Sequence, residues 1–183
     1  MGDPARLRNK YERPKQLWDS DRIQEEKGFK NSYGLKNMRE LWIALAWLKK
    51  YRREARRLLS MSEEERAEPA KKILVKLNRY AILKETSTLD DILSLTVKDI
   101  LERRLQTLVV RKGMAKSMVQ ARQLITHGFI AVSGKKVSVP SYLVYTADET
   151  GISYSKPIDL ETKPPVVEEA KEAPKEEAAS SAG

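Results

Sequence analysis

The chain has 183 residues, which is enough for one or two ordinary domains with a buried core. It contains no cysteine and a single histidine, so disulfides, thiolate metal sites, cysteine nucleophiles and multi-histidine metal centres are excluded. With 35 Lys and Arg against 26 Asp and Glu, the formal net charge is +9. The longest apolar run, residues 41–48, is far shorter than the ~20 residues of a membrane-spanning helix. Because no apolar signal segment opens the sequence, we expect a cytosolic chain with no membrane partner.

The positive charge is concentrated in two parts of the sequence. Residues 1–60 carry 16 basic and 8 acidic side chains, and residues 101–160 carry 9 and 4. Residues 61–100 are close to neutral with 7 and 8, and residues 161–183 are acidic with 3 and 6. Two basic blocks separated by a neutral one predict two surfaces for a polyanion, with the neutral block as a scaffold.

The two ends of the sequence lack the periodicity of a folded element. Residues 1–33 mix basic side chains with prolines, which predicts an extended basic arm that orders on a phosphate backbone, with Tyr11 and Trp18 available for base stacking. A merely flexible basic terminus is the alternative. From residue 156 onward Glu, Lys, Ala, Pro and Ser dominate, so we predict a disordered acidic tail over 156–183. The RNA contacts expected from the arm are Arg6, Arg8, Lys10 and Arg13.

Residues 34–97 are predicted to form a helical domain with a nucleic-acid-binding face. A long helix comes first, with apolar side chains at spacings of three, four or seven. Its second half presents cations that only Glu54 opposes, which favours a nucleic-acid face over a solvated one. These cations are Lys49, Lys50, Arg52, Arg53, Arg56 and Arg57. Ser62 begins another helix that Pro69 interrupts or restarts, and residues 81–96 form a loop and a short helix.

Residues 98–155 are predicted to form a small α+β module. A helix capped by Thr96 ends near Gly113, and a second helix begins at Ser117. Short strands follow, starting with a hairpin around the two-residue turn Ser133-Gly134. The expected fold class is therefore α+β, with a mostly helical N-terminal region and a small RNA-binding module of two helices and four to five strands.

The basic and amide side chains of this module predict a site for structured RNA. Arg104 and Arg111 are seven residues apart, so a continuous helix would stack them on the same side. Lys116 precedes the cap at Ser117, which places a lysine beside a helix N-terminus as a seat for phosphate. Phosphate contacts position an RNA, whereas amides and hydroxyls test its groove. The further candidates are Lys112, Gln120, Arg122, Gln123, His127, Lys135 and Lys136.

The sequence shows no pattern for catalysis. His127 stands at a predicted helix end, where a histidine is more often a capping or surface residue than a base. The acidic runs at residues 63–65 and 90–91 are explained by helix capping. There is no nucleophile elbow, glycine-rich phosphate loop or HExxH motif. We therefore expect no enzyme, and no metal, cofactor or small-molecule substrate.

Five stretches of the module are specific in combination. They are Leu101-Glu102-Arg103-Arg104-Leu105-Gln106-Thr107, Lys112-Gly113-Met114-Ala115-Lys116-Ser117, Ala121-Arg122-Gln123-Leu124-Ile125-Thr126-His127-Gly128, Ile130-x-Val132 and Val137-x-Val139-Pro140-Ser141-Tyr142. Together they closely resemble the universal small-subunit ribosomal protein S-four family. Tyr33-Gly34-Leu35-Lys36-Asn37 is similar to its archaeal and eukaryotic branch. The similarity spans residues 33–155.

This resemblance implies that the module is the alpha-L type of RNA-binding domain, which several RNA-acting proteins share. It implies direct binding of small-subunit rRNA at a multi-helix junction, nucleation of subunit assembly and support of translational accuracy. It also implies a place in the cytoplasmic small subunit, beside neighbouring ribosomal proteins and mRNA where the message enters. Matched by motif position, the RNA contacts would be Arg103, Arg104, Lys116, Ser117, Gln120, Arg122 and Gln123.

The chain departs from the family pattern at several places. Gln106, Met118 and Ser133 stand where the module commonly has aspartate, arginine and asparagine. Some relatives also carry an N-terminal cysteine cluster for a metal, which this cysteine-free chain lacks. Two other functions stay open: a nucleolar-type assembly factor with the same module, and a protein that acts through its acidic tail. An RNA-modifying enzyme such as a pseudouridine synthase would need a further catalytic domain, for which 183 residues are too few.

Overall fold

The computed structural model describes residues 9–84 and 86–156. In chain order, the described elements are α1 (Ser20–Ser32), α2 (Met38–Leu59), α3 (Glu63–Arg79), α4 (Leu89–Ser94), α5 (Val97–Glu102), α6 (Leu105–Arg111), α7 (Met118–Thr126), β1 (Ile130–Val132), β2 (Lys135–Lys136), α8 (Thr146–Glu149) and β3 (Ile152–Tyr154). The α+β class is confirmed. The predicted acidic tail lies outside the described residues, apart from Lys156. No described helix is long and apolar enough to cross a membrane.

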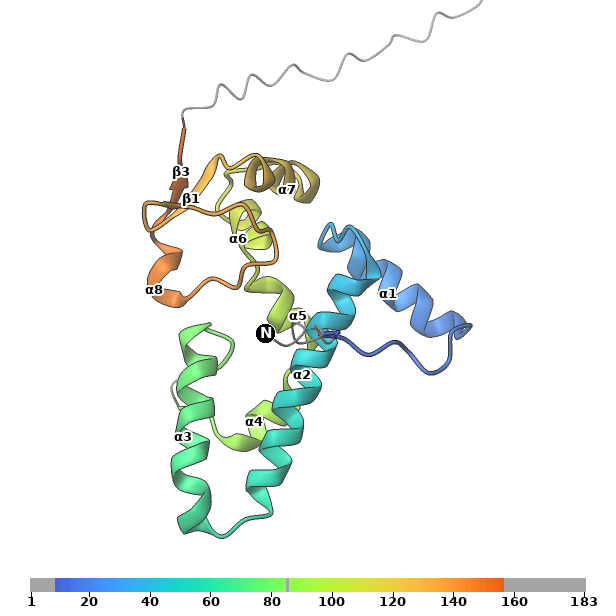
Figure 1. The fold of residues 1–183 in the computed structure, drawn as a ribbon, viewed down its shortest axis with the longest axis vertical. Coiled ribbons are helices and arrows are strands. Elements are labelled where there is room, and N and C mark those ends of the chain that lie inside the picture. The colour runs from blue at the N-terminus through green and yellow to red at the C-terminus, as the bar shows by residue number, and fades with distance from the viewer. Residues whose placement is uncertain (1–8, 85, 157–183) are drawn as a thin grey trace, which may run out of the picture.

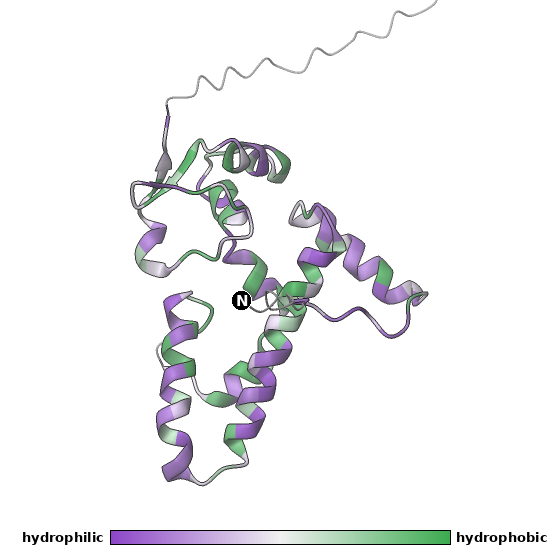
Figure 2. Cartoon of the chain, in the orientation of Figure 1, coloured by the Kyte–Doolittle hydropathy of each residue, from purple (hydrophilic) through white to green (hydrophobic). Residues whose placement is uncertain are grey.

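The lower part of the molecule is built on the long helix α2 (Figure 1). One face of this helix buries a continuous apolar stripe, as the spacing of its apolar residues predicts. Its hydrophilic residues lie on the outer face, so hydrophobic and hydrophilic colours alternate along the ribbon (Figure 2). α3 returns antiparallel to α2, and α4 and α5 complete the first apolar cluster. The largest fully buried side chains of this cluster are Leu41, Leu77, Ile92 and Leu101.

The upper part of the molecule carries a second apolar cluster between α6, α7 and a small sheet. The sheet is antiparallel with the order β2-β1-β3, and Val132 pairs with Lys135 on one side and Ile152 on the other. Ser133 and Gly134 connect β1 to β2 with φ values of 49° and 75°, so the predicted two-residue hairpin turn is confirmed. Leu105, Val109, Ala121, Ile125, Ile130 and Val144 form the centre of this cluster.

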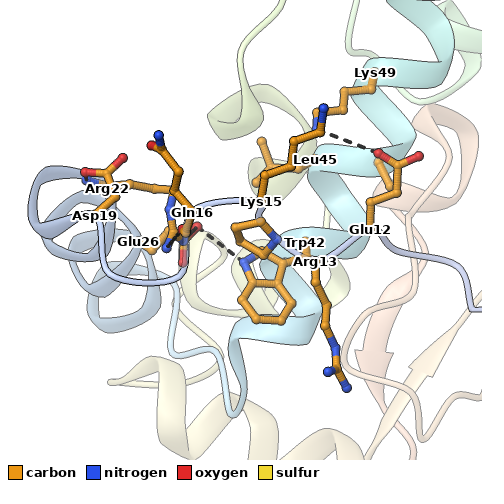
Figure 3. A pocket seen from close by; sticks show the side chains of 12 residues that line it. Glu12, Arg13, Lys15, Gln16, Asp19, Arg22, Glu26, Trp42, Leu45 and Lys49 are labelled. Atoms are coloured by element: carbon orange, nitrogen blue, oxygen red, sulfur yellow. Dashed lines mark hydrogen bonds and ion pairs between the residues drawn. The ribbon is translucent and has the colours of Figure 1, made fainter.

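α1 corrects the prediction that residues 1–33 form an extended arm. Asp19 begins this helix by accepting a hydrogen bond from the Arg22 backbone N–H at 3.4 Å. The Arg22 guanidinium in turn donates to the buried Glu26 carboxylate at 2.7 Å. Glu26 also accepts from the Trp42 indole of α2 at 3.3 Å, so one polar network fixes α1 to α2 (Figure 3). Polar anchoring of this kind leaves no hydrophobic periodicity in the sequence, which is why the helix was not predicted.

The helix predicted between Thr96 and Gly113 is divided in two. Arg104 has extended backbone angles, with φ −73° and ψ 142°, and forms a single β-bridge with Leu143. Arg104 therefore stands at the N-terminal cap of α6, while Arg111 is the last residue of that helix. The prediction that a continuous helix stacks these two arginines is wrong.

Two further predictions about local structure need correction. α3 continues through Pro69 without a break, although the proline lies beyond the first turn and leaves the Glu65 carbonyl without its helical N–H donor. Among the described residues, the sheet has three strands rather than four or five. The stretch from Tyr142 to Tyr145 contributes one isolated bridge and otherwise forms a loop that packs across both clusters.

Candidate nucleic-acid interface

The second half of α2 presents the cationic face that the sequence predicts. Five of its six cations are exposed, namely Lys49, Lys50, Arg53, Arg56 and Arg57. Arg52 differs, because its guanidinium turns inward and donates to the Leu95 carbonyl between α4 and α5. The cations in the last turn also interact favourably with the helix dipole, which lets α2 carry this charge without losing helicity.

The predicted basic arm is only partly described. Lys10 and Arg13 are exposed, whereas Arg6 and Arg8 lie outside the described residues. Of the two aromatic side chains expected to stack on bases, Tyr11 lies against Trp42 with ring centroids 5.9 Å apart. Trp18 is 94% exposed beside the N-terminus of α1.

A second set of exposed polar groups surrounds α7. The Ser117 hydroxyl accepts from the Gln120 backbone N–H at 3.2 Å and so caps the helix, as predicted. The Gln120 side chain accepts from the Lys116 backbone N–H at 2.8 Å. The Lys116 side chain is exposed beside this helix N-terminus. The other exposed candidates are Lys112, Gln123, His127, Lys135 and Lys136.

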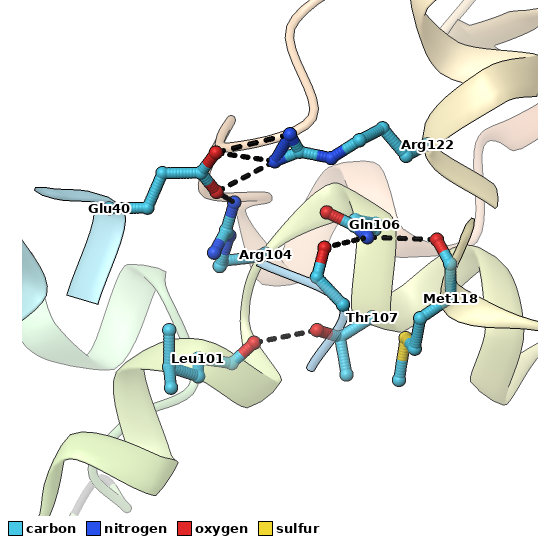
Figure 4. Close-up of polar contacts among 8 residues, drawn as sticks. Glu40, Leu101, Arg104, Gln106, Thr107, Met118 and Arg122 are labelled. Carbon is cyan, nitrogen blue, oxygen red and sulfur yellow. Dashed lines mark hydrogen bonds and ion pairs between the residues drawn. The ribbon is translucent and has the colours of Figure 1, made fainter. Parts of the chain in front are cut away.

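One carboxylate, that of Glu40 on α2, meets two arginines of the upper part of the molecule. Glu40 accepts from the Arg104 guanidinium at 2.6 Å and from Arg122 on α7 at 2.6, 2.7 and 3.1 Å (Figure 4). Arg104 is only 4% exposed. Burial would raise the pKa of Glu40, but the hydrogen bonds and charges of the two guanidiniums outweigh it and hold this pKa below its usual range. Glu40 is therefore the ionised centre of a three-residue clamp, Glu40–Arg104–Arg122.

Two other predicted arginines also face carboxylates. Arg103 donates to Glu149 at 2.8 Å, and Arg111 donates to Glu102 at 3.0 Å. Arg111 is well exposed, so its guanidinium is also accessible from solvent. All four arginines predicted in the module thus have an ionic partner among the described residues, and their contact with RNA stays a prediction.

A second polar seam joins the two parts of the molecule next to the clamp. Gln106 is buried and donates to the Gly34 carbonyl at 3.1 Å and to the Met118 carbonyl at 2.8 Å (Figure 4). Tyr33 donates to Glu102 at 2.9 Å, and burial together with this hydrogen bond raises the pKa of Tyr33 to about 12. Two positions where the chain departs from the family pattern, Gln106 and Met118, therefore meet at one place in the structure.

The sequence did not predict the cations of α3. The first half of α3 contains Glu63, Glu64, Glu65 and Glu68. These carboxylates offset the cations of the helix in the net charge of residues 61–100. In the structure the two signs are separated along the helix axis. Lys72, Lys76 and Arg79 are exposed in the last two turns, and the Lys76 ammonium lies 5.8 Å from the ring centroid of Tyr51 on α2. Counting charge turn by turn instead of over 40 residues would have revealed this stretch.

The fold and these surfaces define a basic α+β protein whose upper part matches a known family. Residues 103–149 match the S4 domain. This range runs from the division between α5 and α6 to the end of α8, and it includes the two arginines of the clamp.

Full-length comparison then identifies the family. The chain is 48% identical over 168 residues to small ribosomal subunit protein uS4 of Saccharolobus solfataricus, covering 91% of this chain and 93% of the relative. It is 47% identical to uS4 of Methanococcus aeolicus, with coverages of 94% and 99%, and 48% identical to uS4 of Ignicoccus hospitalis, with coverages of 85% and 93%. The chain belongs to the uS4 family, in its archaeal type. The predicted resemblance is confirmed, and so is the prediction that the chain is not an enzyme.

Proposed function

We propose that the chain is a structural constituent of the small ribosomal subunit and binds small-subunit rRNA directly, at a multi-helix junction. The observation that carries the proposal is the 48% identity to a uS4 protein over 91% of the chain. The exposed cations of α2 and of the α7 region support it, because neutralised phosphates supply most of the affinity of such proteins.

The geometry supports a multivalent mode of binding. The α2 face belongs to the lower part of the molecule and the α7 region to the upper part, and the Glu40 clamp joins the two. Surfaces held at a fixed separation engage several RNA helices with less loss of conformational entropy than surfaces on a flexible linker. In an RNA junction several helices meet at set angles. Two protein surfaces at a fixed separation can therefore contact more than one of these helices at the same time.

The finer roles are proposed on the same basis. We place the protein in the cytoplasm within the small subunit, where it nucleates assembly, contacts neighbouring ribosomal proteins, lies near entering mRNA and supports translational accuracy. The exposed residues are the proposed direct contacts, with the phosphate seat at Lys116 and Ser117 among them. RNA contacts are also proposed for Arg103, Arg104 and Arg122. Their guanidiniums face carboxylates and are less accessible to RNA than the exposed side chains.

Binding of the full chain to transcribed archaeal small-subunit rRNA tests this function. Across a salt series, log affinity should fall by about 0.7–0.9 per log unit of salt for each phosphate neutralised. The variant Arg53→Gln/Arg56→Gln/Arg57→Gln should bind more weakly and with a shallower slope, whereas Lys98→Gln, an exposed control on α5, should match wild type. A flat salt response would overturn the proposal. Recovery with precursors but never with mature subunits would instead indicate an assembly factor.

A further inference from the structure

A groove outside these surfaces lies between the C-terminal end of α3 and α8. Its volume is about 790 Å³, and Val75, Arg79, Leu83, Lys84 and Tyr145 are among the residues that line it. Figure 1 shows the upper end of α3 directly below α8, so the groove is formed where the lower and upper parts of the molecule meet. The residues that α3 contributes to the groove are not among the predicted RNA contacts, and they lie outside the S4 domain match.

The groove has a well-defined framework. Tyr80 stacks on Tyr145 with ring centroids 4.9 Å apart and an angle of 18° between the planes. The Thr146 hydroxyl donates to the carbonyls of Asn78 and Arg79, at 3.4 and 3.1 Å, and so ties α8 to the end of α3. Because both aromatic rings and both helix ends are held in this way, the groove is formed before any ligand binds.

The groove offers one aromatic surface and two cations to a ligand. Tyr145 is 39% exposed, and Arg79 and Lys84 are both exposed at the rim. Among the described residues that line the groove, one is acidic: Asp148, whose carboxylate accepts a hydrogen bond from the Ser133 hydroxyl at 2.7 Å and is thereby directed to the hairpin. An aromatic ring next to cations on an apolar floor is the arrangement that holds an unpaired nucleotide.

The charge of this region also continues from the α2 face. Lys76 lies one turn before Arg79 and reaches over Tyr51 of α2, so exposed cations extend along α3 toward the groove. A phosphate backbone that crosses α2 would therefore meet positive charge on its way to Tyr145. A basic protein segment would be repelled by the same cations, which favours RNA as the ligand.

We propose that this groove binds one unpaired nucleotide of the small-subunit rRNA, with its base stacked on Tyr145 and its phosphate between Arg79 and Lys84. The inference rests on the proposed function, since it requires that the chain binds rRNA. It adds a single-stranded contact to a surface that otherwise neutralises phosphates.

Three variants of the full chain, bound to transcribed archaeal small-subunit rRNA, test this site. Tyr145→Leu removes the stacking surface and should weaken binding by roughly five- to 150-fold. Tyr145→Phe keeps the ring and should retain the wild-type affinity. Arg79→Gln/Lys84→Gln should reduce the salt slope by about 0.7, because the one single-strand phosphate between these two side chains is no longer neutralised. Lys98→Gln serves again as the exposed control.

The outcomes separate the site from the function as a whole. If wild type does not bind the rRNA, the proposed function itself fails. If wild type binds and Tyr145→Leu binds equally well, only the groove assignment is overturned. The groove assignment is also overturned if Tyr145→Leu keeps its rRNA affinity but a neighbouring protein is lost from the subunit. If Tyr145→Leu melts early through loss of its stack on Tyr80, the Arg79→Gln/Lys84→Gln slope decides, because both of those side chains are exposed.

Discussion

Replacing Glu40 with glutamine removes the carboxylate shared by Arg104 and Arg122 while keeping the size of the side chain. An amide oxygen can still accept a hydrogen bond from one guanidinium, but both arginines lose their counter-charge. Removing one partner of a fully buried ion pair costs about 3–5 kcal/mol, and the partial exposure of Glu40 and Arg122 lowers our expectation to about 2–3 kcal/mol. For a fold of this size, that corresponds to a decrease in Tm of roughly 4–12 °C.

Thermal and urea unfolding of the full chain, followed by circular dichroism, measure this loss. The matched control is Glu63→Gln, which removes an exposed ion pair of similar length, 2.8 Å to Arg66, and should change stability by less than about 0.5 kcal/mol. The pH dependence provides a second readout. Because the pKa of Glu40 is lowered in the folded state, its contribution is complete above the ordinary value of 4.5 and is lost as the pH falls through the folded-state value.

Two results would refute the reasoning. One is a Glu40→Gln variant as stable as the Glu63→Gln control at neutral pH, which would mean that solvent replaces the carboxylate at no cost. The other is a stability difference between wild type and Glu40→Gln that does not shrink at acidic pH. Either result would show that the clamp does not hold the two parts of the molecule together.

Three further predictions concern the same seam and α1. Gly34→Ala should destabilise the fold by about 2–3 kcal/mol in thermal melts, because Gly34 has a φ of +57° and the added Cβ would lie 2.6 Å from that of Met118; an unchanged Tm would contradict this. Gly28→Ala, whose added Cβ would have no atom within 4 Å beyond its chain neighbours and its own helix backbone, should stabilise α1 by about 0.5–1 kcal/mol, and a lower Tm would argue against the helix. Difference titration against Tyr33→Phe should place the ionisation of the Tyr33 phenol near pH 12 instead of 10. Since this pKa is raised in the folded state, the stability advantage over Tyr33→Phe should be complete below pH 10 and fade toward pH 12, and a constant difference would be inconsistent with the Glu102 hydrogen bond.

The features that the sequence predicts well depend on neighbouring residues. Thr96 caps a helix, as expected, and forms a capping box with Asp99, with a 2.7 Å hydrogen bond from the Thr96 backbone N–H to the carboxylate. Gly113 has a φ of +73°, as its position after a helix predicts. The hairpin turn and the apolar stripe of α2 were predictable for the same reason. Each of these depends on contacts within a few residues, so the signal and the structure lie in the same stretch of chain.

The features that could not be predicted depend on polar contacts between distant residues. Glu40 is 64 residues from Arg104 and 82 from Arg122, and no local pattern relates them. An arginine predicted to face RNA and an arginine in a buried clamp have the same sequence signature, so the site was predicted as a set of residues without its internal pairing. α1 was missed for the same reason, because the contacts of Glu26 that hold it are polar.

The two apolar clusters are each drawn from one uninterrupted stretch of chain. The buried residues of the first lie between residues 35 and 101, and those of the second between residues 105 and 152. During synthesis the first cluster therefore has all its buried partners before the second has been translated, and segments generally fold in that order. The clamp joins the two only when Arg122 has emerged. Its formation would be a late step, in which two preformed halves acquire the relative orientation in which the groove at Tyr145 is complete.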